Sequence, residues 1–175
     1  YSVRSNDGKT RSAKIQFSVS TDLAVHQPAQ EVAVSGAKSQ KLAWLKAGTK
    51  EQPVLKRKGD DVRIDWGYLY VAAPLQYKPD QSVSETISLF SKSPGSMEGQ
   101  SLQMNTILPI ENVGSQPIEQ FIMLGYDDIF SVQYFEKNLL PWWKLSGSNI
   151  EMELAKAGSQ HKEEIRRCEA FDKKI

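Results

Sequence analysis

The stretch Val62-Arg63-Ile64-Asp65-Trp66-Gly67-Tyr68-Leu69-Tyr70-Val71 carries the strongest strand pattern in this chain. Large apolar and aromatic residues recur at every second position, namely Val62, Ile64, Trp66, Tyr68 and Tyr70. Because successive side chains of a strand point to opposite faces, this alternation predicts one strand with an aromatic face. We expect that face to be part of a buried core, while an exposed row of rings would suit a sugar or another planar ligand.

Shorter strand patterns separated by turn residues fill the rest of the first 126 residues. They cover residues 1–5, 13–20, 32–34, 41–45, 86–90, 102–110 and 118–126. Asn6-Asp7-Gly8 predicts a hairpin turn between the first two. No helical pattern alternates with these strands, which disfavours a parallel α/β sheet. The sequence therefore predicts a mainly β fold, an antiparallel β-sandwich followed by C-terminal α-helices.

Helical spacing replaces the alternation after residue 126. Apolar residues then recur three or four positions apart, at Ile129, Val132, Phe135 and Leu139. The preceding Asp127-Asp128 pair suits the start of a helix, where it would cap the backbone and interact with the positive end. We therefore divide the chain into a β-sandwich domain over residues 1–126 and a helical linker over residues 127–175.

A second helix is expected in the tail, beginning at Ser148 or Asn149. Its apolar residues form a single stripe, made of Ile165, Cys168, Phe171 and Ile175. An apolar stripe on an otherwise charged helix needs a partner surface, so we expect this helix to connect the sandwich to another body. The chain opens without Met and stops within the helical pattern, and we take it to be an excised part of a longer protein.

Composition excludes several classes of function. The 175 residues hold 22 Lys and Arg against 21 Asp and Glu, a net charge of +1, which disfavours a basic nucleic-acid binder. No apolar run approaches the roughly 20 residues that cross a bilayer. One cysteine cannot form an internal disulfide, and two histidines, His26 and His161, leave little for a metal centre. We expect no metal and no other cofactor.

A few polar and aromatic residues stand out as candidates for a site. Asp65 lies within the apolar strand, where a surface-facing side chain is the commoner arrangement. The Asp127-Asp128 pair could divide acid and base work, although a helix cap is the simpler interpretation. Trp142-Trp143 follows Pro141, and paired tryptophans in a loop favour an interface with a neighbouring domain over a ligand site.

Three segments resemble the glutaminase A family. The first runs from Phe121 to Phe135 (FIMLGYDDIFSVQYF) and continues in Asn138-Leu139-Leu140-Pro141-Trp142-Trp143. The second is Asp65-Trp66-Gly67-Tyr68 with the following Leu69 to Ala73, and the third is Cys168-Glu169-Ala170-Phe171-Asp172. The resemblance implies the N-terminal β-sandwich domain of a secreted, periplasmic or cell-surface enzyme. It also implies that residues 127–175 lead towards an α/α toroid, like that of six-hairpin glycosidases, which carries the catalytic centre.

The resemblance leaves alternative functions to be weighed. The first is a non-catalytic domain, inactive alone, that packs against the toroid of a hydrolase acting on the side-chain amide of glutamine. The alternative is a carbohydrate-binding accessory domain of a glycosidase-like cell-envelope protein, and a third is a protein-interaction sandwich without a small ligand. We assign no catalytic residue. The candidates for the domain interface, or for the rim of an active site that contacts glutamine or a sugar, are Asp65, Trp66, Tyr68, Asp127, Asp128, Tyr134, Trp142 and Trp143.

Overall fold

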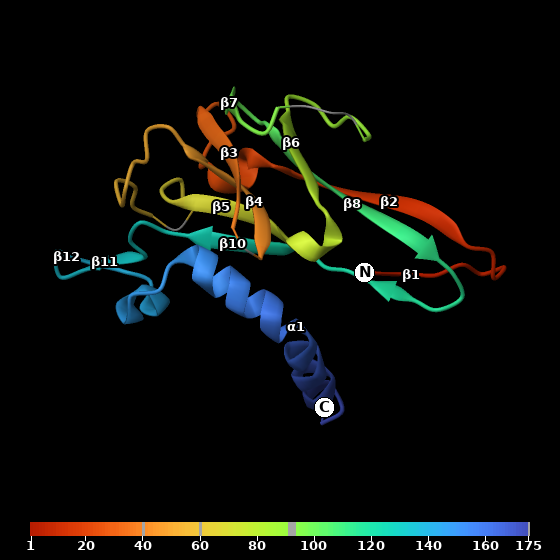
Figure 1. Ribbon diagram of the computed structural model, residues 1–175. Coiled ribbons are helices and arrows are strands. Elements are labelled where there is room, and N and C mark those ends of the chain that lie inside the picture. Colours follow the sequence, from red (N-terminus) through yellow and green to blue (C-terminus); the bar gives the residue numbers. More distant parts are fainter. Residues whose placement is uncertain (40, 60, 91–93, 175) are drawn as a thin grey trace.

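Two antiparallel sheets form the body of the protein (Figure 1). The computed structural model describes residues 1–39, 41–59, 61–90 and 94–174. The larger sheet has the strand order β10-β5-β4-β3-β7, with β3 (Val32–Lys38), β4 (Leu42–Thr49), β5 (Tyr68–Pro74), β7 (Met97–Gly99) and β10 (Met123–Asp127). The smaller sheet has the order β2-β8-β6, with β2 (Arg11–Ser20), β6 (Asp80–Ser84) and β8 (Gln103–Val113).

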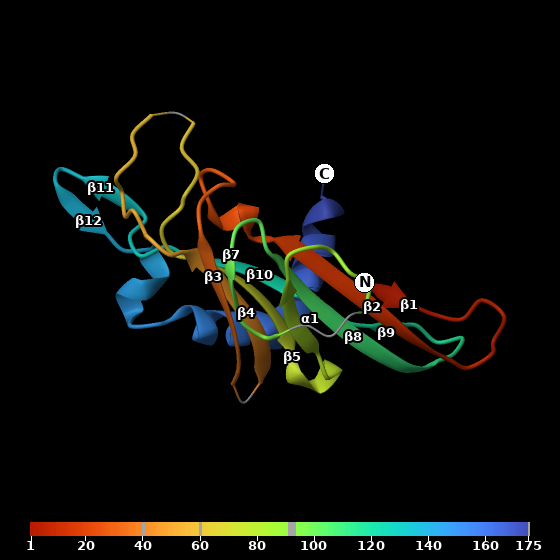
Figure 2. The same cartoon turned by 90° about the horizontal axis from the view of Figure 1, so that it is seen from above.

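Short elements lie at the two ends of this body (Figure 2). At one end β1 (Ser2–Val3) pairs with β9 (Ile118–Glu119), and at the other β11 (Val132–Tyr134) pairs with β12 (Lys137–Leu139). The 3-10 turns are η1 (Thr21–Ala24), η2 (Leu75–Tyr77) and η3 (Trp142–Ser146). The chain ends in a long helix, α1 (Ile150–Asp172).

The main hydrophobic core lies between the two sheets. Leu69 and Val71 of β5 and Leu45 of β4 enter it from the larger sheet, while Val83 and Met104 enter it from β6 and β8. All five side chains are fully buried. The inward-facing apolar side chains of these strands thus form one continuous layer between the sheets, as expected for a sandwich.

A second, smaller core covers the outer face of the larger sheet. Tyr70 and Ala72, which alternate with the residues of the main core, pack there with Ile150 and Leu154 from the first turns of α1. Gly125 permits this contact, because a Cβ atom at that position would lie 3.2 Å from Leu154 Cδ2. β5 is therefore buried on both faces, and the helix is attached through the edge strand β10 and its neighbour.

The second half of α1 leaves the sheet and extends away from the body (Figure 1). Ile165, Cys168 and Phe171 are exposed there, so most of the predicted apolar stripe is uncovered. Ile175 lies outside the described residues. Ion pairs join Glu163 to Arg166 and Glu164 to Arg167. None of the helices in the described part of the chain has the length and apolar character required to span a bilayer.

The predicted fold class is confirmed: the chain is an antiparallel β-sandwich followed by a C-terminal helix. The start of α1 is also confirmed, since Asn149 Oδ1 accepts a hydrogen bond from Met152 N at 2.9 Å. The helix predicted from Ile129 to Leu139 is wrong, because this segment forms the β11–β12 hairpin. Its two turn residues, Phe135 and Glu136, adopt left-handed φ angles of 44° and 62°, which is the geometry of a two-residue hairpin turn.

Three strand predictions also need correction. Residues 1–5 do not pair with residues 13–20; β1 pairs with β9, and β2 pairs with β8. Residues 86–90 form no strand, and β6 ends before them at Ser84. The strand predicted from Val62 begins only at Tyr68, because Gly67 has a φ of 94° and breaks the extended backbone.

Replacing Leu69 by alanine tests how much the main core contributes to the free energy of unfolding. Leu69 is fully buried between the sheets, so we expect Leu69→Ala to lower the free energy of unfolding by about 2–5 kcal/mol. Urea denaturation followed by circular dichroism measures this loss. Ile87→Ala serves as the control, because Ile87 is 65% exposed and its truncation should change stability by less than about 0.5 kcal/mol. Equal effects of the two substitutions would contradict the assigned core.

Candidate functional site

Several of the predicted site residues meet where β5 begins and β10 ends. Tyr68 is the register partner of Asp127 in the β5–β10 ladder. Trp66 precedes β5, and Asp128 follows β10. Lys144 and Trp143 of η3 complete a group that we call the junction cluster, made of Trp66, Tyr68, Asp127, Asp128, Trp143 and Lys144.

Lys144 holds the two carboxylate residues at the end of β10. Its ammonium forms an ion pair with Asp127 and donates a hydrogen bond to the backbone oxygen of Asp128 at 2.8 Å. Both side chains of the ion pair are about four-fifths buried, so this contact is less screened by water than a surface pair. The expected helix cap is absent: the aspartates instead attach the η3 turn to the larger sheet.

Burial changes the acidity of two groups here. Burial and, secondly, the nearby Asp127 carboxylate raise the pKa of Asp128 above its ordinary value of 3.8. Burial also raises the pKa of Tyr70, and the carboxylates of Asp127 and Glu151 add to the effect. Among the described residues, the ammonium of Lys144 lies against both of these aspartates.

Trp66 and Gly67 fix the backbone beside the cluster. Trp66 is buried, and its indole Nε1 donates a hydrogen bond to the backbone oxygen of Phe130 at 2.7 Å. A Cβ atom at Gly67 would collide with the backbone oxygen of Asp127, and its φ of 94° also favours glycine. The close approach of these two backbones explains the glycine between Trp66 and Tyr68.

Asp65 does not face the solvent as expected. Its side chain is fully buried, and Oδ2 accepts hydrogen bonds from Gln30 Nε2 at 2.8 Å and Arg57 Nε at 3.2 Å. Oδ1 has no hydrogen-bond partner among the described residues. The backbone oxygen of Asp65 accepts a bond from Thr49 Oγ1 at 2.7 Å. Asp65 therefore ties the loop between β4 and β5 to the loop before β3 and to the end of β4, and its carboxylate is buried because it is paired.

The aromatic face of β5 is largely covered. Tyr70 is buried under α1, and its ring centroid lies 5.4 Å from that of Trp44. Tyr68 is half-buried, and Lys46 Nζ lies 3.6 Å from the centroid of its ring. Trp66 precedes the strand and is buried separately. The three rings are therefore not an exposed row on which a sugar could stack.

The hairpin and the η3 turn carry a surface of exposed apolar side chains. Phe135 and Trp142 are each 82% exposed and Leu145 is 75% exposed. We call this the hairpin surface, made of Val132, Tyr134, Phe135, Leu139, Leu140, Trp142 and Leu145. Such clustering on one segment differs from singly scattered surface residues and is typical of an interaction site.

The two adjacent tryptophans have different environments. Trp142 points into solvent, whereas Trp143 is half-buried against the second core and lies 5.2 Å from Lys144 Nζ. Tyr134 belongs with Trp142 on the exposed surface, where its ring contacts Phe135 edge to face at 4.5 Å. Of the predicted interface residues, only Tyr134 and Trp142 are therefore well exposed.

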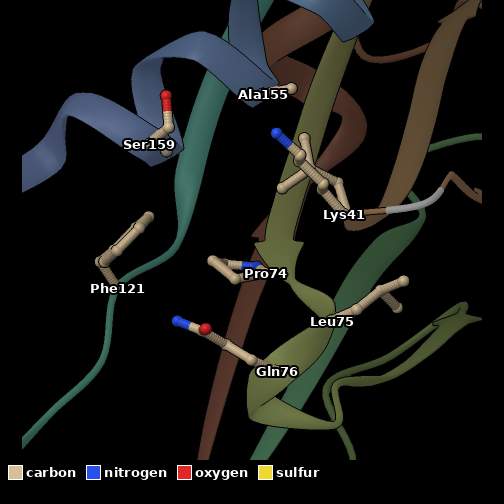
Figure 3. Close-up of a pocket in the computed structure, with 9 residues that line it drawn as sticks. Lys41, Pro74, Leu75, Gln76, Phe121, Ala155 and Ser159 are labelled. Atoms are coloured by element: carbon tan, nitrogen blue, oxygen red, sulfur yellow. The ribbon is translucent and has the colours of Figure 1, made fainter.

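A groove that the sequence did not indicate runs between α1 and the adjoining strand ends. One cavity of about 300 Å³ is lined by Lys41, Pro74, Gln76, Phe121 and Ser159 among others (Figure 3). A second cavity of about 620 Å³ shares Gln76, Phe121 and Ser159 with it and continues past Tyr77 and His161 to Tyr1. We call the two cavities together the helix groove. No motif marks it, because its residues come from five separate segments of the chain.

The histidines make local contacts on separate elements. His161 of α1 stacks on Phe121 with 4.0 Å between ring centroids, and His26 Nδ1 accepts a hydrogen bond from Arg63 N at 3.4 Å. Within residues 1–39, 41–59, 61–90 and 94–174, no three His, Cys, Asp or Glu side chains gather closely enough to hold a metal ion.

The family described as a domain of unknown function (DUF5127) matches residues 1–175, and the chain belongs to this family. Comparison with curated proteins and with solved structures gave no match.

Stability should depend on the ionisation of Asp128. Because its pKa in the folded protein is above 3.8, folding favours the protonated form, and the stability that this group contributes falls as the pH rises from 3.8 through the raised pKa. We therefore expect Asp128→Asn to raise Tm at pH 7, and we expect the gain over the wild type to shrink as the pH falls towards 3.8. Thermal unfolding at several pH values measures both effects.

The matched control is Asp61→Asn, since Asp61 is exposed in the loop before β5. Its Tm should follow the wild type at every pH. A lower Tm of Asp128→Asn at pH 7 would contradict the prediction, because it would mean that the charged carboxylate stabilises the fold.

Proposed function

We propose that this member of the DUF5127 family is the non-catalytic β-sandwich domain of a glutaminase A-like hydrolase, and that it binds the helical catalytic domain of that protein through the hairpin surface. In the whole protein, the chemistry would be hydrolysis of the side-chain amide of glutamine. The proposal takes the enzyme class from the resemblance of residues 65–73 and 121–143 to that family. The observation that carries the binding role is the exposure of the hairpin surface.

The conformation of the hairpin supports a role in binding. Phe135 is held at a φ of 44°, a region that glycine or asparagine normally occupies, and it is 82% exposed. Its side chain gains little burial within this chain to offset that strain. Strained residues concentrate where a surface has a function, and a partner that buries Phe135 would supply the missing apolar contact.

The attachment of the hairpin also supports the proposal. The η3 turn is fixed to the larger sheet by the Lys144–Asp127 ion pair, and Phe130 is fixed by Trp66 Nε1. An exposed apolar loop that is held in place loses less conformational entropy on binding than a mobile one. The exposed end of α1, with Phe171, offers further apolar surface to the same helical domain.

The junction cluster fits a structural role better than a catalytic one. Acid–base chemistry needs a carboxyl group that can reach the substrate. The carboxylate of Asp127 is already engaged in an ion pair with the ammonium of Lys144. Amide hydrolysis also needs an activated nucleophile and donors for an oxyanion. The Ser131 hydroxyl lies beside the Asp128 carboxyl, but both histidines of the described chain make their contacts elsewhere, with Phe121 and Arg63. We therefore place catalysis in the helical domain of the whole protein.

A carbohydrate-binding role through β5 receives no support from the structure. Tyr70 is covered by α1, Trp66 is buried, and Lys46 lies over the ring of Tyr68. A saccharide would have to displace α1 to reach the ring of Tyr70.

Substituting the hairpin surface tests the binding role. We expect Phe135→Ser, Trp142→Ser and Leu145→Ser together to weaken the affinity of residues 1–175 for a separately produced helical domain of a glutaminase A protein by at least about tenfold, because central aromatic side chains dominate binding energy. Isothermal titration calorimetry measures the affinity. The Tm of the variant should stay within a few degrees of the wild type, since these side chains make few contacts in this chain.

The control variant combines Ile87→Ser and Leu89→Ser, which remove exposed apolar side chains from a loop away from the hairpin. It should bind the helical domain with unchanged affinity. Equal weakening by both variants, or unchanged affinity of the hairpin variant, would contradict the assignment of the surface.

An activity assay tests the non-catalytic assignment. Residues 1–175 alone should release no ammonia from glutamine above the rate of a buffer blank, whereas the whole protein should. Ammonia release by the isolated chain that disappears in Asp127→Asn would place the catalytic centre in the junction cluster and overturn the proposal. The amide variant keeps the shape of Asp127 while removing its charge.

A further inference from the structure

The lining of the helix groove differs from that of the junction cluster and from the hairpin surface. Its larger cavity, about 620 Å³, falls within the roughly 300–1,000 Å³ of typical small-ligand sites. The lining combines aromatic rings with uncharged polar side chains, including Tyr77, Phe121, Gln76, Gln120 and Ser159. Glu119 and Lys162 contribute one charge of each sign, which favours a neutral ligand over an anion or a cation.

The aromatic rings form a connected array across the groove. Tyr77 of η2 meets Phe121 edge to face, with ring centroids 5.7 Å apart, and Phe121 stacks on His161 of α1 at 4.0 Å. Tyr1 donates a hydrogen bond from its hydroxyl to Gln120 Oε1 at 2.5 Å. Tyr1 is exposed and Tyr77 is partly exposed, so ring surface remains available inside the groove.

Hydrogen-bonding groups lie beside these rings. Gln76 is exposed, and its carboxamide makes no hydrogen bond to any described residue. Figure 3 shows this carboxamide reaching toward Phe121, with Pro74 beside it and Lys41 on the far side. An amide that both donates and accepts, next to an aromatic ring, can bind a vicinal pair of hydroxyl groups while the apolar face of the same molecule packs on the ring.

We propose that the helix groove is a binding site for a neutral saccharide, whose ring packs against Tyr77 and Tyr1 and whose hydroxyl groups bind Gln76 and Ser159. Two features of the groove favour this class. Its charged side chains have both signs, Lys41 and Lys162 with Glu119, so they form no purely cationic pocket for a phosphate or a carboxylate. Its polar groups are spread along an open channel. The smaller cavity extends the channel along α1, so a second sugar ring has room beyond Phe121.

This site is independent of the function proposed above. The groove lies beside the middle of α1 and β9, whereas the hairpin surface belongs to β11, β12 and η3. Substitutions in one should leave the other unchanged. Failure of the saccharide site would therefore not affect the proposed docking of a helical domain.

Nuclear magnetic resonance titration of residues 1–175 tests the proposal. The probes are cellobiose, maltose, xylobiose and N,N′-diacetylchitobiose, each added at millimolar concentrations, with L-glutamine as a separate arm. At least one disaccharide should shift the amide resonances of Gln76, Phe121 and His161, while those of Tyr134 and Leu139 on the hairpin stay unchanged. No shift with any of the disaccharides, or shifts only with L-glutamine, would overturn the saccharide assignment.

Variants of the groove distinguish a role in saccharide binding from a role in stabilising the fold. Gln76→Ala should weaken the affinity for the disaccharide by about fivefold or more without changing Tm, because Gln76 is exposed and its carboxamide makes no hydrogen bond to another described residue. Ser159→Trp should abolish binding by filling the groove from the exposed face of α1. The control is Gln100→Ala, an exposed glutamine beside β7 at the opposite edge of the larger sheet from β10. Unchanged affinity in both groove variants would show that the resonance shifts arise elsewhere and would overturn the site.

Discussion

The burial of β5 on both faces is the constraint on which the rest of the structure depends. Leu69 and Val71 face the smaller sheet, while Tyr70 and Ala72 face α1. Each of these four residues is at most 3% exposed. A strand buried on both sides fixes the position of every element that covers it. The sandwich, the helix and the turn between them are thus placed by a single segment of about seven residues.

This placement explains how the junction cluster is attached to the larger sheet. β10 pairs with β5 along its whole length, and Asp127 at its end carries the Lys144 ion pair that holds the η3 turn. Gly67 lets the backbone before β5 approach the backbone of Asp127 closely, so even a methyl group would separate the two. The hairpin surface is consequently presented by a fixed support.

Sequence periodicity was sufficient to predict those elements whose apolar residues follow a regular spacing. The sandwich class, the alternation in β2, and the start of α1 at Asn149 all follow from local patterns. The position of Asp65 did not, because an isolated aspartate in an apolar stretch gives no sign of the Gln30 and Arg57 side chains that make its burial possible. The helix groove was not visible either, since Tyr1, Gln76, Phe121 and His161 converge only through the tertiary fold.

The hairpin shows where periodicity misleads. Ile129, Val132, Phe135 and Leu139 have the spacing of an amphipathic helix, yet they belong to a hairpin and its flanks, and three of them are exposed. Periodicity predicts secondary structure only when the apolar residues are buried against their own chain, because that burial is what imposes the period. Apolar residues that are exposed in the folded chain are free of this condition. The failure of the helix prediction at residues 129–139 and the exposure of the hairpin surface therefore have one common cause.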